Sequence, residues 1–220
     1  MAGNALVWDE TGKRTYETGV ENVALYVMDD TGTYGEGVAW NGVTGIAESP
    51  SGAETTSLYA DDIKYLTLIS AEEYGFTIEA YGSPEEFDAC DGMAELTKGV
   101  SVRQQSRKPF GLAYKTKLGN DVKGTDYGYK LHLIYGAQAS PSEKGYSTIN
   151  DSPEAITLSW EATTTPINVT GHKATAHIEI DSTKIDSAKL QKLEDALFGG
   201  TAKPKLLLPD EIVQTVNAAG

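Results

Sequence analysis

Several short segments of this chain alternate between apolar and polar residues, and this alternation most constrains the fold. In residues 75–81, the side chains of Phe76, Ile78 and Ala80 share one face, and polar residues occupy the other. A period of two is that of a half-buried strand, with one face in a core and one in solvent. Further strands are predicted at residues 23–28, 34–46, 65–70, 129–135, 156–160 and 174–180. About seven or eight such strands predict a β-sandwich or barrel.

The connections between these strands are predicted from turn and helix signals. Residues 49–57 have loop composition, residues 71–74 are expected to join two strands as a hairpin, and residues 119–125 read as a hairpin tip. A helix is predicted from Ser83, with Pro84 at its first position, Phe87 and Cys90 pointing inward and Gly92 as its end. A second helix is predicted over residues 182–198, ended by Gly199 and Gly200. Leu206–Leu208 then look like part of an arm that another surface must cover.

The charge of the chain is unevenly distributed. It has 32 acidic and 18 basic residues, a formal net charge of −14. Residues 1–100 hold 19 acids and four bases, whereas residues 101–130 hold seven bases and two acids. Copies of one chain can use such an asymmetry, because an acidic surface on one copy can face a basic surface on the next. The alternative is that these charges simply lie on solvated loops.

Motifs for chemistry are nearly absent. Residues 119–125 lack the lysine that a phosphate-binding loop needs after its second glycine. His172 and His177 would face opposite sides of a strand, and His132 is alone on another, so no metal site is expected. Cys90 is expected to be a small buried apolar residue. No catalytic, cofactor-binding or metal-binding residue is predicted, and the chain is not expected to be an enzyme.

The cellular setting is also predicted from the sequence. A single cysteine excludes an internal disulfide, and the longest apolar run, residues 23–28, is far shorter than the roughly 20 residues of a membrane-spanning helix. The first residues do not have the pattern of a signal peptide. These features lead us to expect a soluble protein made in the cytoplasm.

Ordered phrases along the chain resemble the major tail tube protein of long, non-contractile-tailed phages, the group whose hosts include Gram-positive bacteria. The resemblance covers about residues 4–200, with residues after 200 matching least. Its carriers are residues 4–8 (NALVW), 23–27 (VALYV), 65–70 (YLTLIS), 76–87 (FTIEAYGSPEEF), 109–114 (PFGLAY), 129–136 (YKLHLIYG) and 156–167 (ITLSWEATTTPI).

The resemblance implies a structural subunit of the virion tail, made in the host bacterial cytoplasm. It implies a mainly β fold with one or two short flanking helices, whose strands join an inner barrel closed by a hexameric ring. The β domain would span residues 1–200, with an N-terminal arm at about 1–20, a ring-contact loop at about 48–62 and a C-terminal arm at 201–220. Its partners would be further copies in stacked rings, and the tail terminator, distal tail and tape-measure proteins. Double-stranded DNA would pass through during genome ejection without sequence recognition, with no membrane and no cofactor involved.

Candidate residues follow from this resemblance and from charge. An acidic wall would repel phosphates and let a duplex slide, whereas a basic wall would hold it. The lumen-facing candidates are Asp61, Asp62, Glu72, Glu73 and Glu79. The ring-stacking candidates are Ser49, Pro50, Ser51, Gly52 and Glu54. The basic inter-subunit candidates are Arg103, Arg107, Lys108, Lys115 and Lys117.

Three alternatives stay open. The tube protein of a contractile tail or of an effector-secreting system would share the same ring arrangement. A carbohydrate-binding or adhesion β-sandwich displayed on a virion would need exposed aromatic residues along a groove, for which Trp8, Trp40, Trp160 and the twelve tyrosines are available. A glycoside hydrolase would need two carboxylates at a fixed separation, which sequence alone cannot show.

Overall fold

The computed structural model of the chain describes residues 5–149, 151 and 154–218. Residues 1–4 of the predicted N-terminal arm, including Asn4 of the first resembling phrase, and residues 219–220 of the C-terminal arm lie outside the described part. The fold is mainly β, with 45% of residues in strands and 11% in helix. This confirms the predicted class, a β-sandwich-like fold with short flanking helices.

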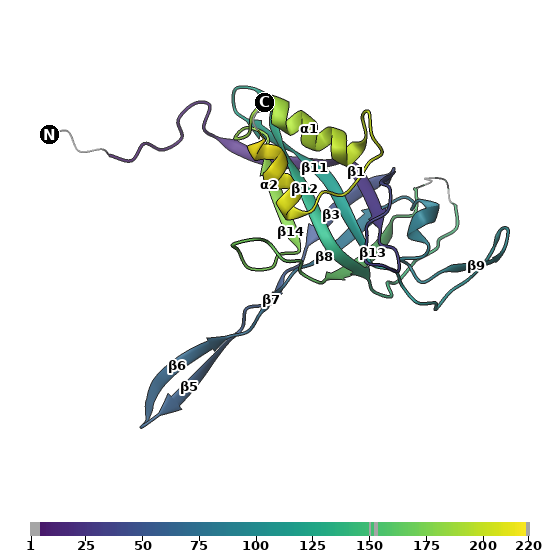
Figure 1. The fold of residues 1–220 in the computed structure, drawn as a ribbon, viewed down its shortest axis with the longest axis horizontal. Coiled ribbons are helices and arrows are strands. Elements are labelled where there is room, and N and C mark those ends of the chain that lie inside the picture. Colours follow the sequence, from purple (N-terminus) through teal and green to yellow (C-terminus); the bar gives the residue numbers. More distant parts are fainter. Residues whose placement is uncertain (1–4, 150, 152–153, 219–220) are drawn as a thin grey trace.

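One antiparallel sheet of eight strands forms the body (Figure 1). Its order is β2-β1-β11-β12-β13-β8-β3, and β14 also pairs with β12. The members of this sheet are β1 (Thr15–Val27), β2 (Val38–Ala39), β3 (Val43–Glu48), β8 (Gly75–Ala80), β11 (Phe110–Asn120), β12 (Gly124–Ala139), β13 (Leu158–Thr164) and β14 (His177–Asp181). Residues 34–46, predicted as one bent strand, instead contribute β2 and β3 to opposite ends of the sheet.

The sheet folds over at Gly136 in the long strand β12. Before this residue β12 pairs with β14, and after it β12 pairs with β13. Gly136 has a φ of +58°, and a Cβ there would lie 2.3 Å from the carbonyl oxygen of Thr165, so only glycine fits. Within one chain the sheet is not closed into a barrel, because β2 and β3 remain as its two ends.

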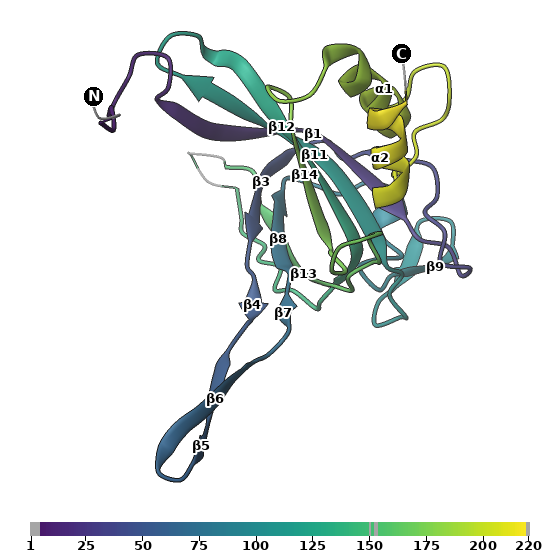
Figure 2. The same ribbon diagram turned by 60° about the vertical axis from the view of Figure 1, so that its left-hand side comes forward.

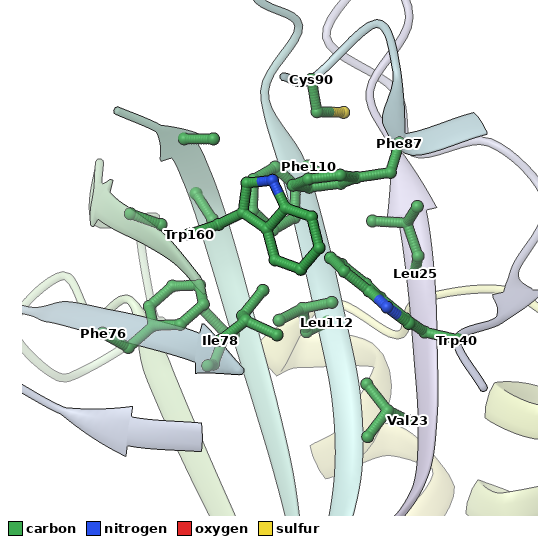
Figure 3. Close-up of a cluster of buried hydrophobic side chains, with 14 of the residues drawn as sticks. Val23, Leu25, Trp40, Phe76, Ile78, Phe87, Cys90, Phe110, Leu112 and Trp160 are labelled. Carbon is green, nitrogen blue, oxygen red and sulfur yellow. The ribbon is translucent and has the colours of Figure 1, made fainter. Parts of the chain in front are cut away.

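The main core lies between the two halves of the folded sheet. Figure 3 shows Trp40, Phe87, Phe110 and Trp160 meeting at its centre. The rings of Trp40 and Phe87 are 4.5 Å apart between centroids, and Phe87 and Trp160 meet edge-on at 5.5 Å. Each large apolar side chain buried here contributes about 1.5–3 kcal/mol to folding.

A second core lies on the other face of β11 and β12, beneath the helices α1 (Ser187–Phe198) and α2 (Pro209–Asn217) (Figure 2). The alternation predicted in residues 129–135 is therefore an alternation between two cores. Leu131, Leu133 and Tyr135 point to the helices, while Ile134 joins the main core.

Helix α1 begins later than the sequence predicts. Residues 182–186 instead form a turn after β14, in which the Asp181 carboxylate accepts hydrogen bonds from the backbone and hydroxyl of Thr183. Asp186 caps the helix by accepting from the backbone N–H groups of Ala188 and Lys189. The predicted end at Gly199 is confirmed.

The helix predicted from Ser83 is wrong. The structure has only a 3-10 turn, η1 (Glu85–Phe87), because the following residues hydrogen-bond across the fold. Lys108 donates its backbone N–H to Ala89, and Gln105 donates to Gly92. The inward positions of Phe87 and Cys90 are confirmed, and both are fully buried.

The C-terminal leucines do not need another surface, which corrects the sequence-based expectation. Leu206 and Leu207 are buried in the second core, and only Leu208 is substantially exposed. The hydroxyl of Tyr135 donates to the Leu207 carbonyl at 2.7 Å. A Cβ on Gly111 would lie 2.3 Å from Leu206, so β11 has a glycine where this leucine packs.

Residues 49–73 form a two-stranded arm that projects from the body (Figures 1 and 2). It comprises β4 (Ser51–Gly52) paired with β7 (Glu72–Glu73), and β5 (Thr55–Ala60) paired with β6 (Ile63–Ile69). The predicted loop at 49–57 and the predicted hairpin at 71–74 are therefore wrong. The chain reverses at Asp61 and Asp62, whose φ values of +50° and +60° suit a tight hairpin turn.

A smaller hairpin, β9 (Ala94–Thr97) with β10 (Val100–Val102), projects elsewhere from the body. The tip predicted within residues 119–125 is confirmed as the turn between β11 and β12. Among the described residues, no helix is both long and apolar enough to cross a membrane.

Candidate assembly surfaces

The projecting arm exposes apolar side chains at high density. All seven residues of β6 are exposed. The exposed large apolar residues of the arm are Leu58, Tyr59, Ile63, Tyr65, Leu66, Leu68 and Ile69. Exposed apolar patches of this kind mark surfaces that another molecule covers.

These apolar residues lie on both faces of the ribbon. Along β6, Leu66 and Leu68 point to one side, and Ile69 points to the other. A two-stranded hairpin with neither face covered is only marginally stable in water. Contact with another surface would therefore stabilise the arm.

Two sets of candidates predicted from sequence meet on this arm. Asp61 and Asp62 form its tip, and Glu72 and Glu73 pair with Gly52 and Ser51 at its base. The ring-stacking candidates Ser49, Pro50 and Glu54 flank that base, where the backbone N–H of Glu54 donates to the Ser70 hydroxyl at 3.0 Å. Residues 49–73 hold five acids and one base, Lys64. Glu79 lies apart from them, on the exposed face of β8.

Each of the five basic candidates contacts a partner within the chain. Lys115 forms the most buried of these contacts, with its Nζ 2.6 Å from Glu194 Oε1 and over the Tyr129 ring. The pairs are Arg103 with the Asp91 carboxylate, Arg107 with the Asp91 and Ala139 carbonyls, Lys108 with Asp30, Lys115 with Glu194 and Lys117 with Glu21. Much of the basic charge of residues 101–130 is thus balanced inside the molecule.

The N-terminal segment also extends away from the body (Figure 1). Leu6, Val7 and Trp8 are each more than 70% exposed. On the small hairpin, Leu96 and Val100 are exposed as well. The chain therefore presents apolar residues on three separate projections.

The tryptophans do not form a glycan-binding groove. Trp40 and Trp160 are both buried in the main core, and the indole N–H of Trp40 donates to the Gly82 carbonyl at 2.8 Å. Trp8 alone of the three is exposed.

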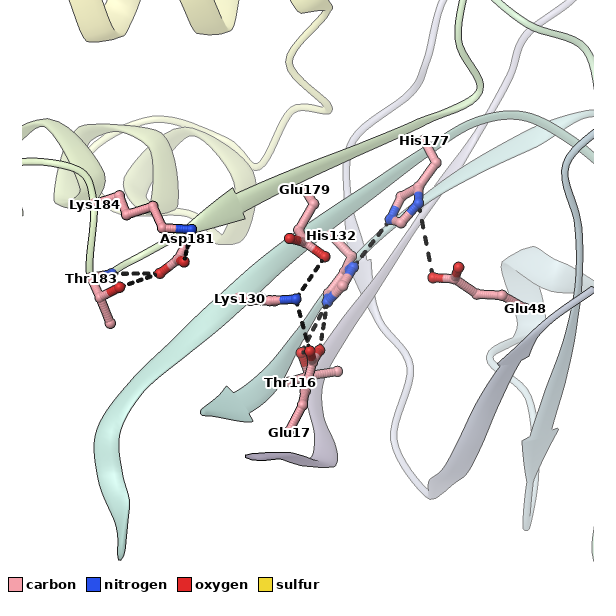
Figure 4. A network of polar contacts seen from close by, with 10 residues as sticks. All are labelled: Glu17, Glu48, Thr116, Lys130, His132, His177, Glu179, Asp181, Thr183 and Lys184. Atoms are coloured by element: carbon pink, nitrogen blue, oxygen red, sulfur yellow. Dashed lines mark hydrogen bonds and ion pairs between the residues drawn. The ribbon is translucent and has the colours of Figure 1, made fainter. Parts of the chain in front are cut away.

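Histidines that sequence reasoning kept apart meet in the structure (Figure 4). His132 Nδ1 lies 3.1 Å from His177 Nε2, because β14 pairs with β12 in a register that sets Glu179 opposite His132 and His177 diagonal to it. The prediction that His132 is alone is wrong. Glu48, His132 and His177 each offer an atom within 4.8 Å of the others. Only the strand register, which the sequence does not show, reveals this group.

Charged side chains surround the histidines. Lys130 Nζ lies 2.8 Å from Glu17 and 3.0 Å from Glu179. Burial opposes ionisation of Glu17, but hydrogen bonds from Lys130 and Thr116 outweigh it and hold the pKa of Glu17 below its usual value. Burial lowers the pKa of both His132 and His177, although nearby carboxylates oppose this.

Cys90 is an inert core residue in this structure. It is fully buried, and burial raises the pKa of its thiol to about 12. A thiol in that environment stays protonated and unreactive near neutral pH.

Comparisons with known proteins assign no family. No protein-family model matches the sequence, and no curated protein matches it. Among solved structures, a chain of the sheath–tube complex of the extracellular contractile injection system PVC, in its extended state, is 16% identical over 76% of this chain and 93% of that one. The TM-score of this superposition is 0.33.

Proposed function

We propose that this protein is the building block of a phage tail tube, in which hexameric rings stack into a channel for the genome. The observation that carries the proposal is the arm of residues 49–73, a two-stranded ribbon with exposed apolar residues on both faces. Within the described residues, the chain offers this arm no surface on which to pack. A further copy of the same chain is the occupant we assign, and the ordered phrases that resemble tail tube proteins support that assignment.

The open ends of the sheet support the same role. Strands β2 and β3 end the sheet within one chain, and unpaired strand edges readily pair with other strands. In a ring, neighbouring copies remove these edges, and their sheets become parts of one larger barrel. A barrel of so many strands is wide enough to remain an open channel.

Charge suits such a channel. The arm has five acids and one base, and its tip and base carry adjacent acid pairs. A duplex has a negative charge about every 1.7 Å of its axis, so acidic side chains along a channel would repel it and let it slide. The role is structural rather than catalytic, without a cofactor, and the partners are the terminator, distal tail and tape-measure proteins of a virion tail.

Assembly of the purified protein tests the proposal. Wild-type protein is expected to form rings or hollow tubes in negative-stain microscopy at high concentration. Leu66→Asp with Leu68→Asp puts charge on one face of the arm and is expected to leave a monomer in light scattering. Val122→Asp, at an exposed apolar position on the β11–β12 turn, is the matched control and should assemble normally.

Two results would refute the proposal. One is a wild-type protein that stays monomeric at every concentration and salt condition tested. The other is an arm variant that assembles like the wild type. Circular dichroism and urea unfolding of each variant show whether the body is still folded, because the arm contributes little to either core.

A further inference from the structure

Five polar side chains form a continuous row from the base of the arm to β1 (Figure 4). We call them the histidine row; in order they are Glu48, His177, His132, Thr116 and Glu17. Glu48 Oε1 lies 3.8 Å from His177 Nδ1, and His177 Nε2 lies 3.1 Å from His132 Nδ1. His132 Nε2 lies 2.9 Å from the Thr116 hydroxyl, which in turn donates to Glu17. Glu48 is the last residue of β3, where the arm begins.

The two imidazole rings face each other edge to edge. Their centroids are 5.3 Å apart and their planes differ by 15°, so the centroid separation exceeds the 3.1 Å nitrogen separation by about two ring radii. Both nitrogens therefore lie close to the line between the rings. A tetrahedral zinc ion would hold the two nitrogens about 3.3 Å apart, with both lone pairs directed at a point to one side of the line between them. Here each nitrogen instead points at the other. This geometry suits a shared proton and not a metal ion.

The row has fewer protons than contacts. Two neutral imidazoles carry one N–H each and the threonine carries one O–H, whereas ionised Glu17 and Glu48 carry none. Three protons are thus available for the four contacts between the five groups. One contact must lack a proton as long as both histidines are neutral.

The geometry identifies the contact that lacks a proton. Thr116 donates to Glu17, so its oxygen can accept from His132 Nε2. His132 Nδ1 is then the acceptor for His177 Nε2, which leaves His177 Nδ1 without a proton opposite Glu48. This is the contact at 3.8 Å, too long for a hydrogen bond.

We propose that the histidine row takes up a single proton in mildly acidic solution, and that this proton fastens the base of the arm to the body. The proton goes to His177 Nδ1, which then donates to the Glu48 carboxylate in a charge-assisted bond of about 2.8 Å. All four contacts are then satisfied. No electron moves and no bond other than N–H forms, so solvent supplies the only reactant.

The return strand of the arm also contacts the row. Tyr74 follows β7, its ring lies 5.0 Å from that of His177, and its backbone carbonyl accepts from Thr164 at 2.6 Å. His177 therefore contacts both strands at the base of the arm, Glu48 on the outgoing strand and Tyr74 on the returning one. A change in its protonation alters both contacts.

The other groups around the histidines limit uptake to one proton. Burial opposes a charge on either histidine, and the positive charge of Lys130 further opposes one on His177, whereas the carboxylates favour it. The titratable and charged groups that face the pair are Glu17 on β1, Glu48 on β3, Glu72 on β7, Tyr74 beside it, Tyr114 on β11, Lys130 on β12 and Glu179 on β14. Once His177 is charged, its field acts directly against a second proton on His132.

Histidine NMR and hydrogen exchange on the full chain test this inference, which does not depend on assembly. Side-chain ¹⁵N spectra between pH 8 and pH 5 should show one proton entering the pair, mainly at His177 Nδ1. Glu48→Gln removes the carboxylate charge and should lower the apparent pKa of the pair by about one unit. Glu79→Gln, on the exposed face of β8, is the control and should leave that pKa unchanged.

Exchange at the base of the arm is the second readout. After correction for the chemical effect of pH, amides of residues 47–52 should exchange several-fold more slowly at pH 5.5 than at pH 7.5, and Glu48→Gln should abolish this difference. Independent titration of the two histidines, or pH-dependent protection that persists in Glu48→Gln, would overturn the inference. So would zinc that binds at pH 7.5 and shifts the ring nitrogen signals of both histidines.

Discussion

At the residue scale, burial and polar contacts act in opposite directions on the histidine row. His132 is only 4% exposed, yet it lies within reach of Glu17 and Thr116. Burial is the larger effect, so both histidines have pKa values below the ordinary value. The unfolded chain accordingly binds protons more readily than the folded protein does at these two positions.

A pH dependence of stability follows from this difference. Stability from the histidines is fully present above about pH 6.5, the ordinary histidine pKa, and decreases as the pH falls through that value toward the lower folded pKa. Urea unfolding at pH 7.5 and 5.5 should show a smaller free energy of unfolding at pH 5.5. His177→Gln should reduce that difference, and an equal difference in wild type and variant would contradict the assignment. The proton that orders the arm thus lowers global stability.

At the element scale, the C-terminal segment is a structural part of the body. Leu206 packs against β11, and α2 lies beside it over the second core. The Lys205 ammonium lies 2.5 Å from Glu211, and the Glu211 side chain accepts from the backbone N–H of Leu208, which holds the start of α2 in place. The segment thus replaces solvent over one face of the sheet.

Two leucine substitutions distinguish a packed segment from a free arm. Leu206→Ala removes a side chain that is 1% exposed and should cost about 2–5 kcal/mol of unfolding free energy. Leu208→Ala, at a position 43% exposed, should cost clearly less. Equal losses in urea unfolding would show that the segment does not pack as the structure has it.

At the scale of the whole molecule, the acidic excess and the apolar projections both bear on the proposed assembly. In the proposed tube, the apolar residues of the arm would promote contact between copies, and the acids at its tip and base would repel nucleic acid. A surface that assembles without binding DNA needs both properties.

Charge reversal tests the second property. Assembled protein with Glu72→Lys and Glu73→Lys should retain duplex DNA at low salt, with an affinity that falls as salt rises. The control pair, Glu85→Lys and Glu86→Lys, changes the same charge on the exposed 3-10 turn of the body and should retain less. In a phage carrying the first pair, genome release should slow. Identical DNA retention by both pairs would place Glu72 and Glu73 away from the channel.

Sequence alone determined the β class, the alternation of Phe76 and Ile78, the end of α1 at Gly199 and the burial of Phe87 and Cys90. These are local properties, since strand period, a helix stop and apolar character belong to a few neighbouring residues. The sequence predicts no strand over residues 110–118, although β11 lies there. Both faces of β11 are covered over residues 110–114, so apolar and polar residues do not alternate there.

Only the tertiary structure decided what depends on partners distant in the chain. Leu206 belongs to the second core because Gly111 leaves space for its side chain. The helix predicted at residues 83–92 does not form, since residues 105 and 108 donate backbone hydrogen bonds to this segment. Residues 49–73 form an arm because β5 pairs with β6. His132 and His177 meet through the β12–β14 register. Each of these outcomes depends on which strands pair and in what register, and a single residue's chemistry does not encode either one.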